Sequence, residues 1–284
     1  MVAEDGGRGA GTLYVVSTPI GNMGDFSFRA VETLKSVALV LAEDTRHSRP
    51  LLQRYDVQTP LAAYHEHNEA RATPGLVARL LGGESIALIS DAGTPLLSDP
   101  GARLTAAAIE AGIAVVPVPG PSALLAALVA SGLPADRFTF YGFLERKGRE
   151  RTEALAEIAT LRHTAILYEA PPRVADTLAD LASVGAGERR AAVAREMTKQ
   201  FEEVRRGTVA TLGAYYAETP PRGEVVIVVA GADPSADAPT EEALRNRARV
   251  LRAEGMSARD VAKALVAETG VGRNLAYQIA QEVQ

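Results

Sequence analysis

The 284-residue chain contains no cysteine. Disulfides, thiolate zinc sites and thiol catalysis are therefore excluded, and a reducing, cytoplasmic setting fits. Positive charge is not in excess either, because 30 Lys and Arg stand against 35 Asp and Glu, a formal net charge of -5. A protein that coats nucleic acid without selectivity needs a basic surface, so the charge argues against that class and requires any RNA to be held by local patches.

Long apolar runs are absent as well. The longer apolar runs, such as residues 124–129 and 225–229, are far shorter than the ~20 residues that a membrane helix needs, so we expect a soluble protein. Residues 1–11 are polar and glycine-rich, without the basic and apolar segments of a secretory signal. We expect them to form a disordered tail.

Several well-known site motifs are missing. The turn after the first predicted strand reads STPIGN rather than G-x-G-x-x-G, and the chain has neither a Walker-type phosphate loop nor a G-x-S-x-G nucleophile elbow. His65 and His67 could share one face of a strand, but no further histidine or cysteine stands at a recognised ligand spacing from them. We therefore expect no metal site.

Strand-like apolar runs alternate with amphipathic helical segments, which predicts an α/β fold. They form two successive blocks, the first with largely parallel strands and the second with fewer helices and a mixed sheet. The break at 131–137 places an N-terminal domain at 12–132 and a second domain at 133–231. The predicted strands are 12–18, 38–43, 61–65, 85–91 and 114–119, then 137–143, 164–169, 190–196, 203–209 and 224–230.

A polar, proline-containing stretch at 232–239 predicts a linker to a helical appendage at 240–284. Thr240 and Ser257 are expected to cap its first two helices, and the glycines at 270–272 to separate the third. This pattern suits a nucleic-acid-binding helix-turn-helix and a packing module equally. Three basic patches could hold RNA or could be solvated surfaces: 145–151, Arg205 with Arg206, and the series Arg245, Arg247, Arg249 and Arg252.

Loop chemistry is concentrated where three strands of the first block end, at 17–22, 90–101 and 117–123. Each turn carries glycine and proline, which allow the backbone to approach a ligand closely. The third turn leads directly into a helix whose free N–H groups could face an anionic group. Because the carboxyl ends of parallel strands meet at one edge of a sheet, the three turns together predict a ligand cleft.

Longer motifs in these regions resemble the tetrapyrrole methylase superfamily and, within it, the 16S rRNA cytidine-2'-O-methyltransferases. The resemblance covers roughly residues 11–231. It rests on seven segments in order: TPIGNMGD at 18–25, AEDTRHS at 42–48, YHEHNE at 64–69, SDAGTPLLSDPG at 90–101, PVPGPSA at 117–123, YEAPPR at 168–173 and AREMTKQFEE at 194–203. It implies a two-domain fold with a cleft for S-adenosylmethionine, usually in a homodimer, and methylation of small-subunit ribosomal RNA.

The resemblance also implies site residues. Those expected at the cofactor are Pro19, Asp91, Gly93, Thr94, Pro95, Ser122, Ala123 and Tyr168. Those expected on the RNA side are Arg46, His47, His65, Asn68 and Lys199. Methyl transfer to a ribose hydroxyl is helped by a base within reach of its proton, and we assign that role to Glu43 and Asp44. Glu169, His47 and Lys199 remain alternatives for the base.

Two other functions stay open. One is methylation of a tetrapyrrole, of the precorrin type, on the same scaffold, although AEDTRHS, YHEHNE and the helical appendage favour ribosomal RNA. The other is a non-catalytic ribosome-assembly factor that has kept the fold. Only the second would leave the protein without affinity for S-adenosylmethionine.

Overall fold

The computed structural model describes residues 9–233 and 240–283, which form two compact units, Met1–Ala230 and Gly231–Gln284. Most of the tail predicted at 1–11 and of the linker predicted at 232–239 lies outside the described residues. Gly11, however, is buried, and its N–H donates to the Leu80 carbonyl at 2.8 Å. The prediction that the tail extends to residue 11 is therefore wrong at its last residue.

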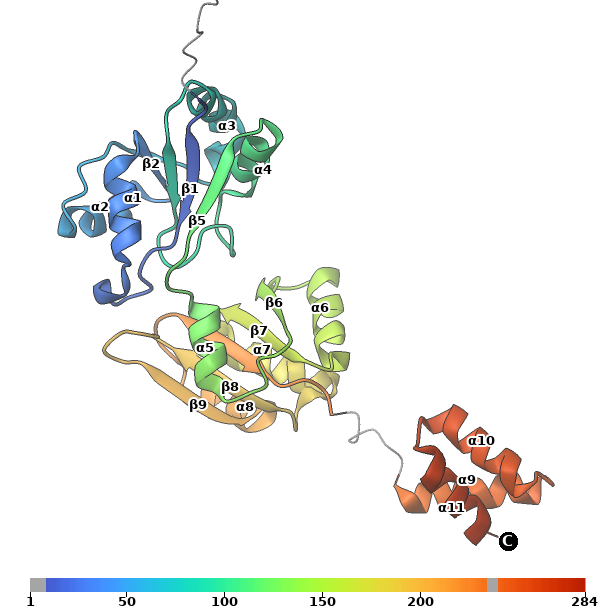
Figure 1. The fold of residues 1–284 in the computed structure, drawn as a ribbon. Helices are drawn as coiled ribbons and strands as arrows, with labels where there is room; N and C mark the ends of the chain where they lie inside the picture. Colours follow the sequence, from blue (N-terminus) through green and yellow to red (C-terminus); the bar gives the residue numbers. More distant parts are fainter. Residues whose placement is uncertain (1–8, 234–239, 284) are drawn as a thin grey trace, which may run out of the picture. The chain divides into compact units, whose positions relative to one another are not determined.

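The first half of the larger unit is a parallel sheet with the strand order β3-β2-β4-β1-β5 (Figure 1). The chain moves from β1 through β2 to β3 in one direction across the sheet and then returns through β4 to β5 in the other. The connections therefore lie on both faces, as in doubly wound α/β folds. The elements are β1 (Thr12–Val16), η1 (Met23–Asp25), α1 (Phe28–Ser36), β2 (Leu39–Ala42), α2 (Thr45–Arg54), β3 (Leu61–Ala63), α3 (Glu66–Leu81), β4 (Ile86–Ile89), α4 (Ala102–Glu110) and β5 (Ala114–Val118).

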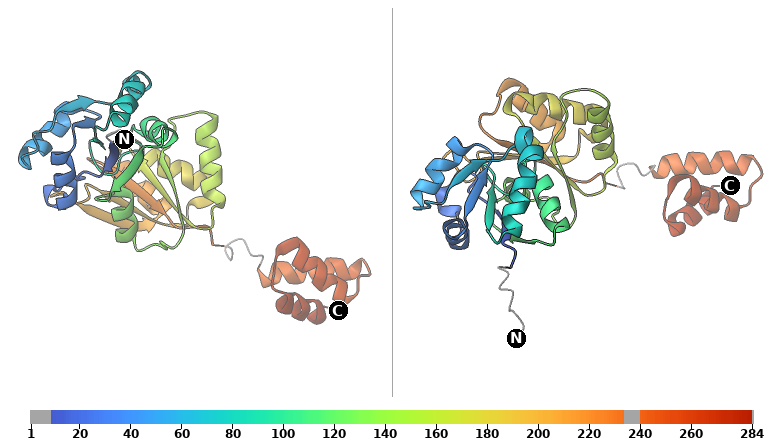
Figure 2. Two further views of the ribbon diagram at one scale, coloured as in Figure 1. Left: turned by 45° about the horizontal axis from the view of Figure 1, so that its top comes forward. Right: turned by 90° about the horizontal axis from the view of Figure 1, so that it is seen from above.

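Helices cover both faces of this sheet, α1 and α2 on one and α3 and α4 on the other (Figures 1 and 2). The alternation along β2 shows why. Val40 and Ala42 pack with α1 and α2, whereas Leu39 and Leu41 pack with α3 and α4. Full burial of an aliphatic side chain contributes about 1.5–3 kcal/mol to stability. Packing on both faces therefore stabilises the sheet, and with it the positions of the strand ends.

The second half is a mixed sheet with the order β6-β7-β10-β8-β9, in which only β6 and β7 are parallel among the pairs in the described residues. All ten predicted strands and the mixed sheet are confirmed. The elements are α5 (Ala123–Ser131), β6 (Phe138–Phe143), α6 (Arg149–Thr160), β7 (Thr164–Glu169), η2 (Pro171–Arg173), α7 (Val174–Leu181), η3 (Ala182–Ala186), β8 (Arg190–Arg195), β9 (Glu203–Thr208), α8 (Val209–Glu218) and β10 (Val225–Val229).

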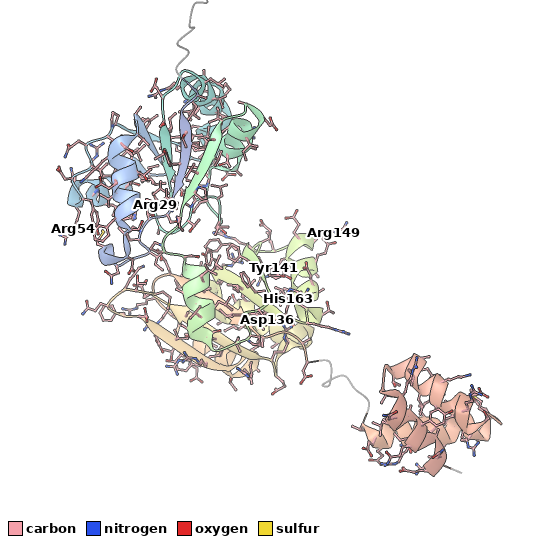
Figure 3. All side chains as sticks on the ribbon, viewed as in Figure 1. Arg29, Arg54, Asp136, Tyr141, Arg149 and His163 are labelled. Atoms are coloured by element: carbon pink, nitrogen blue, oxygen red, sulfur yellow. The ribbon has the colours of Figure 1, made fainter. Side chains whose placement is uncertain are left out.

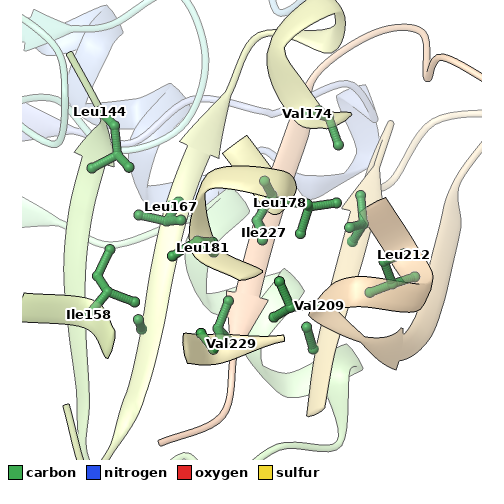
Figure 4. Packing of buried hydrophobic residues seen from close by; sticks show 14 of the residues in the cluster. Leu144, Ile158, Leu167, Val174, Leu178, Leu181, Val209, Leu212, Ile227 and Val229 are labelled. Atoms are coloured by element: carbon green, nitrogen blue, oxygen red, sulfur yellow. The ribbon is translucent and has the colours of Figure 1, made fainter. Parts of the chain in front are cut away.

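This sheet is also covered on both faces, which explains why β10 consists only of Val and Ile. Ile227 and Val229 belong to a core built with α6, α7 and α8, shown in Figure 4. Val226 and Val228 pack instead with Leu124 and with other residues of α5. The structure therefore places α5 on the second sheet, whereas the predicted boundary at 132 assigned it to the first domain.

The smaller unit consists of α9 (Glu241–Ala253), α10 (Ala258–Thr269) and α11 (Arg273–Glu282) around its own apolar core. The predicted caps are confirmed: Thr240 accepts from the Ala243 N–H and Ser257 from the Asp260 N–H, both at 3.2 Å. Gly270 ends α10 in the left-handed region, with φ 69°. The unit therefore has the local sequence signals of an independently capped three-helix module.

Candidate active site

The turns that follow β1, β4 and β5 are hydrogen-bonded to one another. The Thr18 N–H donates to the Gly93 carbonyl at 2.8 Å, and the Gly93 N–H donates to the Thr18 carbonyl at 3.1 Å. The Thr94 hydroxyl lies 2.9 Å from that of Ser17 and donates to the Pro121 carbonyl at 3.3 Å. The three turns that predicted a ligand cleft therefore meet at the carboxyl edge of the first sheet.

A cavity of about 410 Å³ opens beside these turns. Small-molecule sites typically measure ~300–1,000 Å³, so it suits one ligand of modest size. The first half of the chain contributes Ile20, Asp91, Ala92, Gly93, Thr94, Leu97, Ser98, Asp99, Ser122 and Ala123. The second half contributes Phe143, Tyr168, Glu169, Ala170, Pro171 and residues 223–226.

Ser122 is a polar group of this wall that lacks a partner. It occupies the N-cap of α5, makes no side-chain cap bond, and its buried Oγ has no hydrogen-bond partner among the described residues. A buried polar atom costs free energy unless it is paired. A ligand with a hydrogen-bonding group would satisfy both this hydroxyl and the free N–H groups of the helix.

The charged groups that line the cavity are all acidic. They are Asp91, Asp99, Glu169 and Glu224. Glu169 is already engaged, because its side chain pairs with Arg173 at 3.3 Å and accepts from the Thr177 hydroxyl at 2.7 Å. Glu224 is also engaged, because it pairs with Lys199 at 3.3 Å. Asp91 and Asp99 have no ion-pair partner among the described residues and give the cavity a negative character that favours a cationic ligand.

The acidity of Asp99 is perturbed by its surroundings. Burial, followed by the nearby carboxylate of Glu43, raises the pKa of Asp99 to about 6, and Asp91 adds to this effect. Burial and then the charge of Asp91 also raise the pKa of Glu43. A carboxyl group that titrates near neutral pH is suited to accept a proton in catalysis.

A second hollow of about 300 Å³ lies at the ends of β2 and β3. It is lined by Glu43, Asp44, Thr45, Arg46, Ala63, His65 and His67. The Asp44 N–H donates to Oδ1 of Asp91 at 3.1 Å, and Asp91 also lines the first cavity. The carboxylate of Asp91 therefore lines the first cavity and also accepts a hydrogen bond from the backbone of the second hollow.

Asp44 has a structural task that its sequence position did not reveal. Its carboxylate caps α2 by accepting from the Arg46 N–H at 2.8 Å, and it pairs with the Arg46 guanidinium at 2.7 Å. These bonds hold the pKa of Asp44 well below its usual range. A carboxylate stabilised in this way is a poor proton acceptor.

The cofactor residues expected from the sequence divide into two groups. Six of the eight line the cavity: Asp91, Gly93, Thr94, Ser122, Ala123 and Tyr168. Pro19 and Pro95 are buried beside it without lining it. We infer that these two prolines shape the turns rather than touch a ligand.

The residues expected on the RNA side are more dispersed. Arg46 and His65 line the second hollow, and His47 is exposed on α2 without lining it. Asn68 caps α3 instead, accepting from the His65 N–H at 2.9 Å. The expectation that His65 and His67 share a strand face is wrong, because His65 is the N-cap of α3 and His67 lies within that helix.

Lys199 lies outside both hollows but next to the first. Its Nζ pairs with Glu196 at 3.0 Å and with Glu224 at 3.3 Å, and its aliphatic stem covers Gly21. The Asn22 N–H donates to the Thr198 hydroxyl at 3.2 Å in the same region. The segment TKQFEE therefore joins the second sheet to the turn after β1.

Several cavity residues were not predicted. Ile20, Asp99 and the segment 223–226 belong to this group, as does Phe143. Asp99 belongs to the segment SDAGTPLLSDPG at 90–101, and its place in that segment could have identified it as a cavity residue. Nothing local distinguishes residues 223–226, because they reach the cavity only through the pairing of β10 with β7 and β8.

The basic patches are largely engaged within the protein. Arg149 pairs with Glu153 on the exposed start of α6 (Figure 3), and the buried Arg151 pairs with Asp180. In the helical module, Arg245 pairs with Glu241 and Glu282, Arg247 with Glu268, and Arg252 donates to two backbone carbonyls. These arginines stabilise the fold locally, which weakens their interpretation as RNA contacts.

Comparison with known proteins identifies the family. A model of the tetrapyrrole (corrin/porphyrin) methylases matches residues 12–213. Proteins named ribosomal RNA small subunit methyltransferase I are 49% identical over 276 residues in Synechocystis sp., covering 96% of this chain and 99% of theirs. In Pseudomonas aeruginosa the identity is 50% over 280 residues, covering 97% and 98%. The chain belongs to this family of methylases.

Solved structures of other proteins share this fold. A uroporphyrin-III C-methyltransferase from Thermus thermophilus superposes with a TM-score of 0.57 at 22% identity, covering 78% of this chain and 94% of that one. A diphthine synthase superposes with a TM-score of 0.60 at 14% identity, covering 77% and 89%. In the described residues of this chain, no helix is long and apolar enough to cross a membrane, and no group of three His, Asp or Glu side chains could hold a metal.

Proposed function

We propose that this chain methylates the ribose 2'-hydroxyl of a cytidine in 16S ribosomal RNA, in the decoding region of the small subunit, with S-adenosylmethionine as methyl donor. The carrying observation is the acidic cavity where the three strand-end turns meet, in a chain about 50% identical to proteins named for methylation of small-subunit ribosomal RNA. A uroporphyrin-III C-methyltransferase from Thermus thermophilus with the same fold, at a TM-score of 0.55, was solved in complex with S-adenyl homocysteine.

The residues of the cavity fit this cofactor. The acidic lining complements a sulfonium cation and an ammonium group, and apolar residues such as Ile20 and Val226 suit an adenine ring. The unpartnered Ser122 hydroxyl and the start of α5 suit a carboxylate. When bound, S-adenosylmethionine supplies a methyl group already activated for displacement, so the protein needs no nucleophile of its own.

The chain's own residues then position the acceptor. The second hollow lies next to the cavity, and Arg46, whose side chain is 90% exposed, borders it. We assign Arg46 and His47 to the RNA backbone. The Arg46 guanidinium pairs with Asp44, but its 90% exposed side chain keeps further N–H donors, which can hold a phosphate without reading sequence. Positioning of this kind supplies much of the catalysis in a displacement reaction.

A carboxylate of this region removes the acceptor proton. Of the two residues first assigned, Asp44 is engaged with Arg46 and caps α2, which leaves Glu43. Asp99 lines the cavity directly, and Glu43 raises the pKa of Asp99. We therefore assign Asp99 as the group that accepts the proton, and Glu43 as the carboxylate whose charge raises the pKa of Asp99.

We also propose that the protein acts as a homodimer in the cytoplasm. One face of the apolar helix α5 packs on the second sheet, while Leu125 and Val129 on α5 are 49% and 79% exposed. Exposed apolar side chains on one helix support a protein contact. Sedimentation of the protein and of Val129→Glu tests this, and a monomeric unaltered protein contradicts it.

The decisive experiment has two parts. Calorimetry with S-adenosylmethionine should show binding, which separates an enzyme from a non-catalytic assembly factor. Mapping of 2'-O-methylation in ribosomal RNA from a strain without this gene, with and without the gene restored, should then show one cytidine whose methylation depends on it. An unchanged map, together with methylation of a uroporphyrinogen-type substrate, would favour a tetrapyrrole methyltransferase.

A further inference from the structure

Strand β6 contains a β-bulge directly before it reaches the cavity. Phe140 pairs with Ile166 of β7, and Phe143 pairs with Tyr168, so three steps along β6 match two steps along β7. An extra residue on one strand bends it and changes the direction of the side chains that follow. Bulges of this kind are frequent next to active sites, where they aim one side chain.

Gly142 makes this bulge possible. Its φ of 63° lies in the left-handed region, which favours glycine, and a Cβ added to it would lie 2.8 Å from Oγ of Ser98. Ser98 belongs to the turn after β4 and itself has a φ of 68°. Non-glycine residues in this region cost free energy and are concentrated at functional sites. The bulge is therefore seated against a strained turn of the cavity wall.

Phe143 is the residue that the bulge turns outward. It lines the cavity, yet 56% of its surface is exposed. Its ring lies 5.5 Å from that of Tyr168, and Tyr168 is held in turn by Phe140 at 4.8 Å in an edge-to-face contact. The neighbouring Leu97 is 38% exposed and also lines the cavity. The Phe143 ring therefore packs against Tyr168 and lies, half exposed, at an apolar part of the cavity wall.

A cavity of about 410 Å³ suits one ligand of modest size, to which the proposed function assigns the cofactor, and the 56% exposed surface of Phe143 is left for a second substrate. Sequence-specific RNA recognition mostly targets single-stranded loops and bulges, whose unstacked bases are free to contact the protein. Proteins that bind unstacked RNA bases place them on aromatic rings. The occupant that fits this ring is therefore a nucleobase.

We propose that Phe143 is a positioning residue on which the base of the methylated nucleotide stacks. This inference rests on the proposed function. In this proposal the bulge places the Phe143 ring where RNA can contact it, and Tyr168 packs against that ring.

The test compares Phe143→Ala with Phe143→Tyr, with Phe138→Ala as the matched control. Phe138 starts the same strand, is 39% exposed and does not line the cavity. Stacking of a base on an aromatic ring contributes about 1–3 kcal/mol, so Phe143→Ala should raise the KM for ribosomal RNA roughly 5- to 150-fold. Phe143→Tyr should restore it, and Phe138→Ala should leave it unchanged.

Two further measurements complete the test. Calorimetric affinity for S-adenosylmethionine should fall by a much smaller factor in Phe143→Ala than the KM for RNA rises, although Phe143 lines the cavity. The fluorescence of a cytosine analogue at the acceptor position should change on binding to the unaltered protein, and this change should be lost with Phe143→Ala. Gly142→Ala, which displaces the bulge, should behave like Phe143→Ala.

Other outcomes overturn the inference. If Phe143→Ala loses cofactor affinity while its KM for RNA is unchanged, the ring contacts the cofactor; if neither changes, it contacts no ligand. Failure of the proposed function is distinct, because the unaltered protein would then transfer no methyl group to ribosomal RNA.

Discussion

The backbone N–H of Asp44 donates a hydrogen bond to Oδ1 of Asp91 at 3.1 Å. This bond joins the start of α2 to the turn after β4, and Asp91 lines the cavity while Asp44 lines the second hollow. The two proposed substrates would therefore be held by loops that share one carboxylate. A change at Asp91 is expected to affect both.

Replacing Asp91 should weaken cofactor binding without unfolding the protein. Asp91→Ala removes both a cavity carboxylate and the acceptor of the Asp44 N–H, whereas Asp91→Asn keeps an acceptor. We expect about a tenfold or greater loss of S-adenosylmethionine affinity in both, because a hydrogen bond to a charged group is worth about 1.5–3 kcal/mol. RNA affinity should fall more in Asp91→Ala. Calorimetry that finds normal cofactor affinity in both variants would remove Asp91 from the site.

Gly93→Val should reduce both stability and cofactor affinity. Gly93 has a φ of 84°, which a β-branched residue adopts only with strain, and an added Cβ would lie 3.4 Å from the Ile20 side chain. Strain of this kind costs about 1–3 kcal/mol, measurable by urea denaturation. Gly93→Ala gives a smaller side chain with the same backbone strain. If Gly93→Val binds the cofactor as well as Gly93→Ala does, side-chain volume at this position does not affect the ligand.

Asp99→Asn should slow methyl transfer far more than it weakens RNA binding. Removal of a general base typically costs about 10²- to 10⁴-fold in rate. The unaltered protein should show a kcat/KM that rises with pH through about 6, because kcat/KM reports the free enzyme, in which the pKa of Asp99 is raised to about 6, and only the carboxylate accepts a proton. Asp99→Asn should lack this rise.

Glu43→Gln and Asp44→Asn complete that series. Glu43→Gln should move the pH at which kcat/KM rises to a lower value, since the charge of Glu43 helps raise the pKa of Asp99. Asp44→Asn should keep its rate, because asparagine caps helices as well as aspartate does. A large rate loss in Glu43→Gln with a normal rate in Asp99→Asn would make Glu43 the base.

Asp99 should also make stability depend on pH. Folding raises the pKa of Asp99 from 3.8 to about 6, so its stabilising contribution is complete below 3.8 and is lost as the pH rises through about 6. Asp99→Asn mimics the protonated form. We expect it to raise the free energy of unfolding by about 1–2 kcal/mol at pH 8, where solvent screens part of the effect, and by little at pH 4. Equal effects at both values would show that Asp99 titrates normally.

Deletion of residues 240–284 should impair methylation of ribosomal RNA more than cofactor binding. The cavity is built entirely from the larger unit, so calorimetry with S-adenosylmethionine should be unchanged. Rates on small subunits should fall and become less dependent on salt if basic residues of the module contact phosphates. Because Arg247 pairs with Glu268, Arg247→Gln should affect the stability of the module rather than RNA binding. A normal rate in the truncated protein would make the module a packing element.

Local patterns were sufficient for much of the fold. Strand-like apolar runs predicted each strand, and the caps at Thr240 and Ser257 followed from the residue types at helix starts. The convergence of the three turns also followed from the sequence, since parallel strands bring their carboxyl ends to one edge. Period and capping depend on neighbours within a few residues, which is why a single sequence reveals them.

Long-range packing decided the rest. Helix α5 is apolar on all sides, so its sequence could not show which sheet it covers. The acidity of Asp99 depends on Glu43, which lies 56 positions away along the chain, and on burial that only the folded cavity produces. The outward turn of Phe143 depends on the pairing of β6 with β7 and on the contact between Gly142 and Ser98. These properties arise from neighbours that folding brings together, and no local pattern contains them.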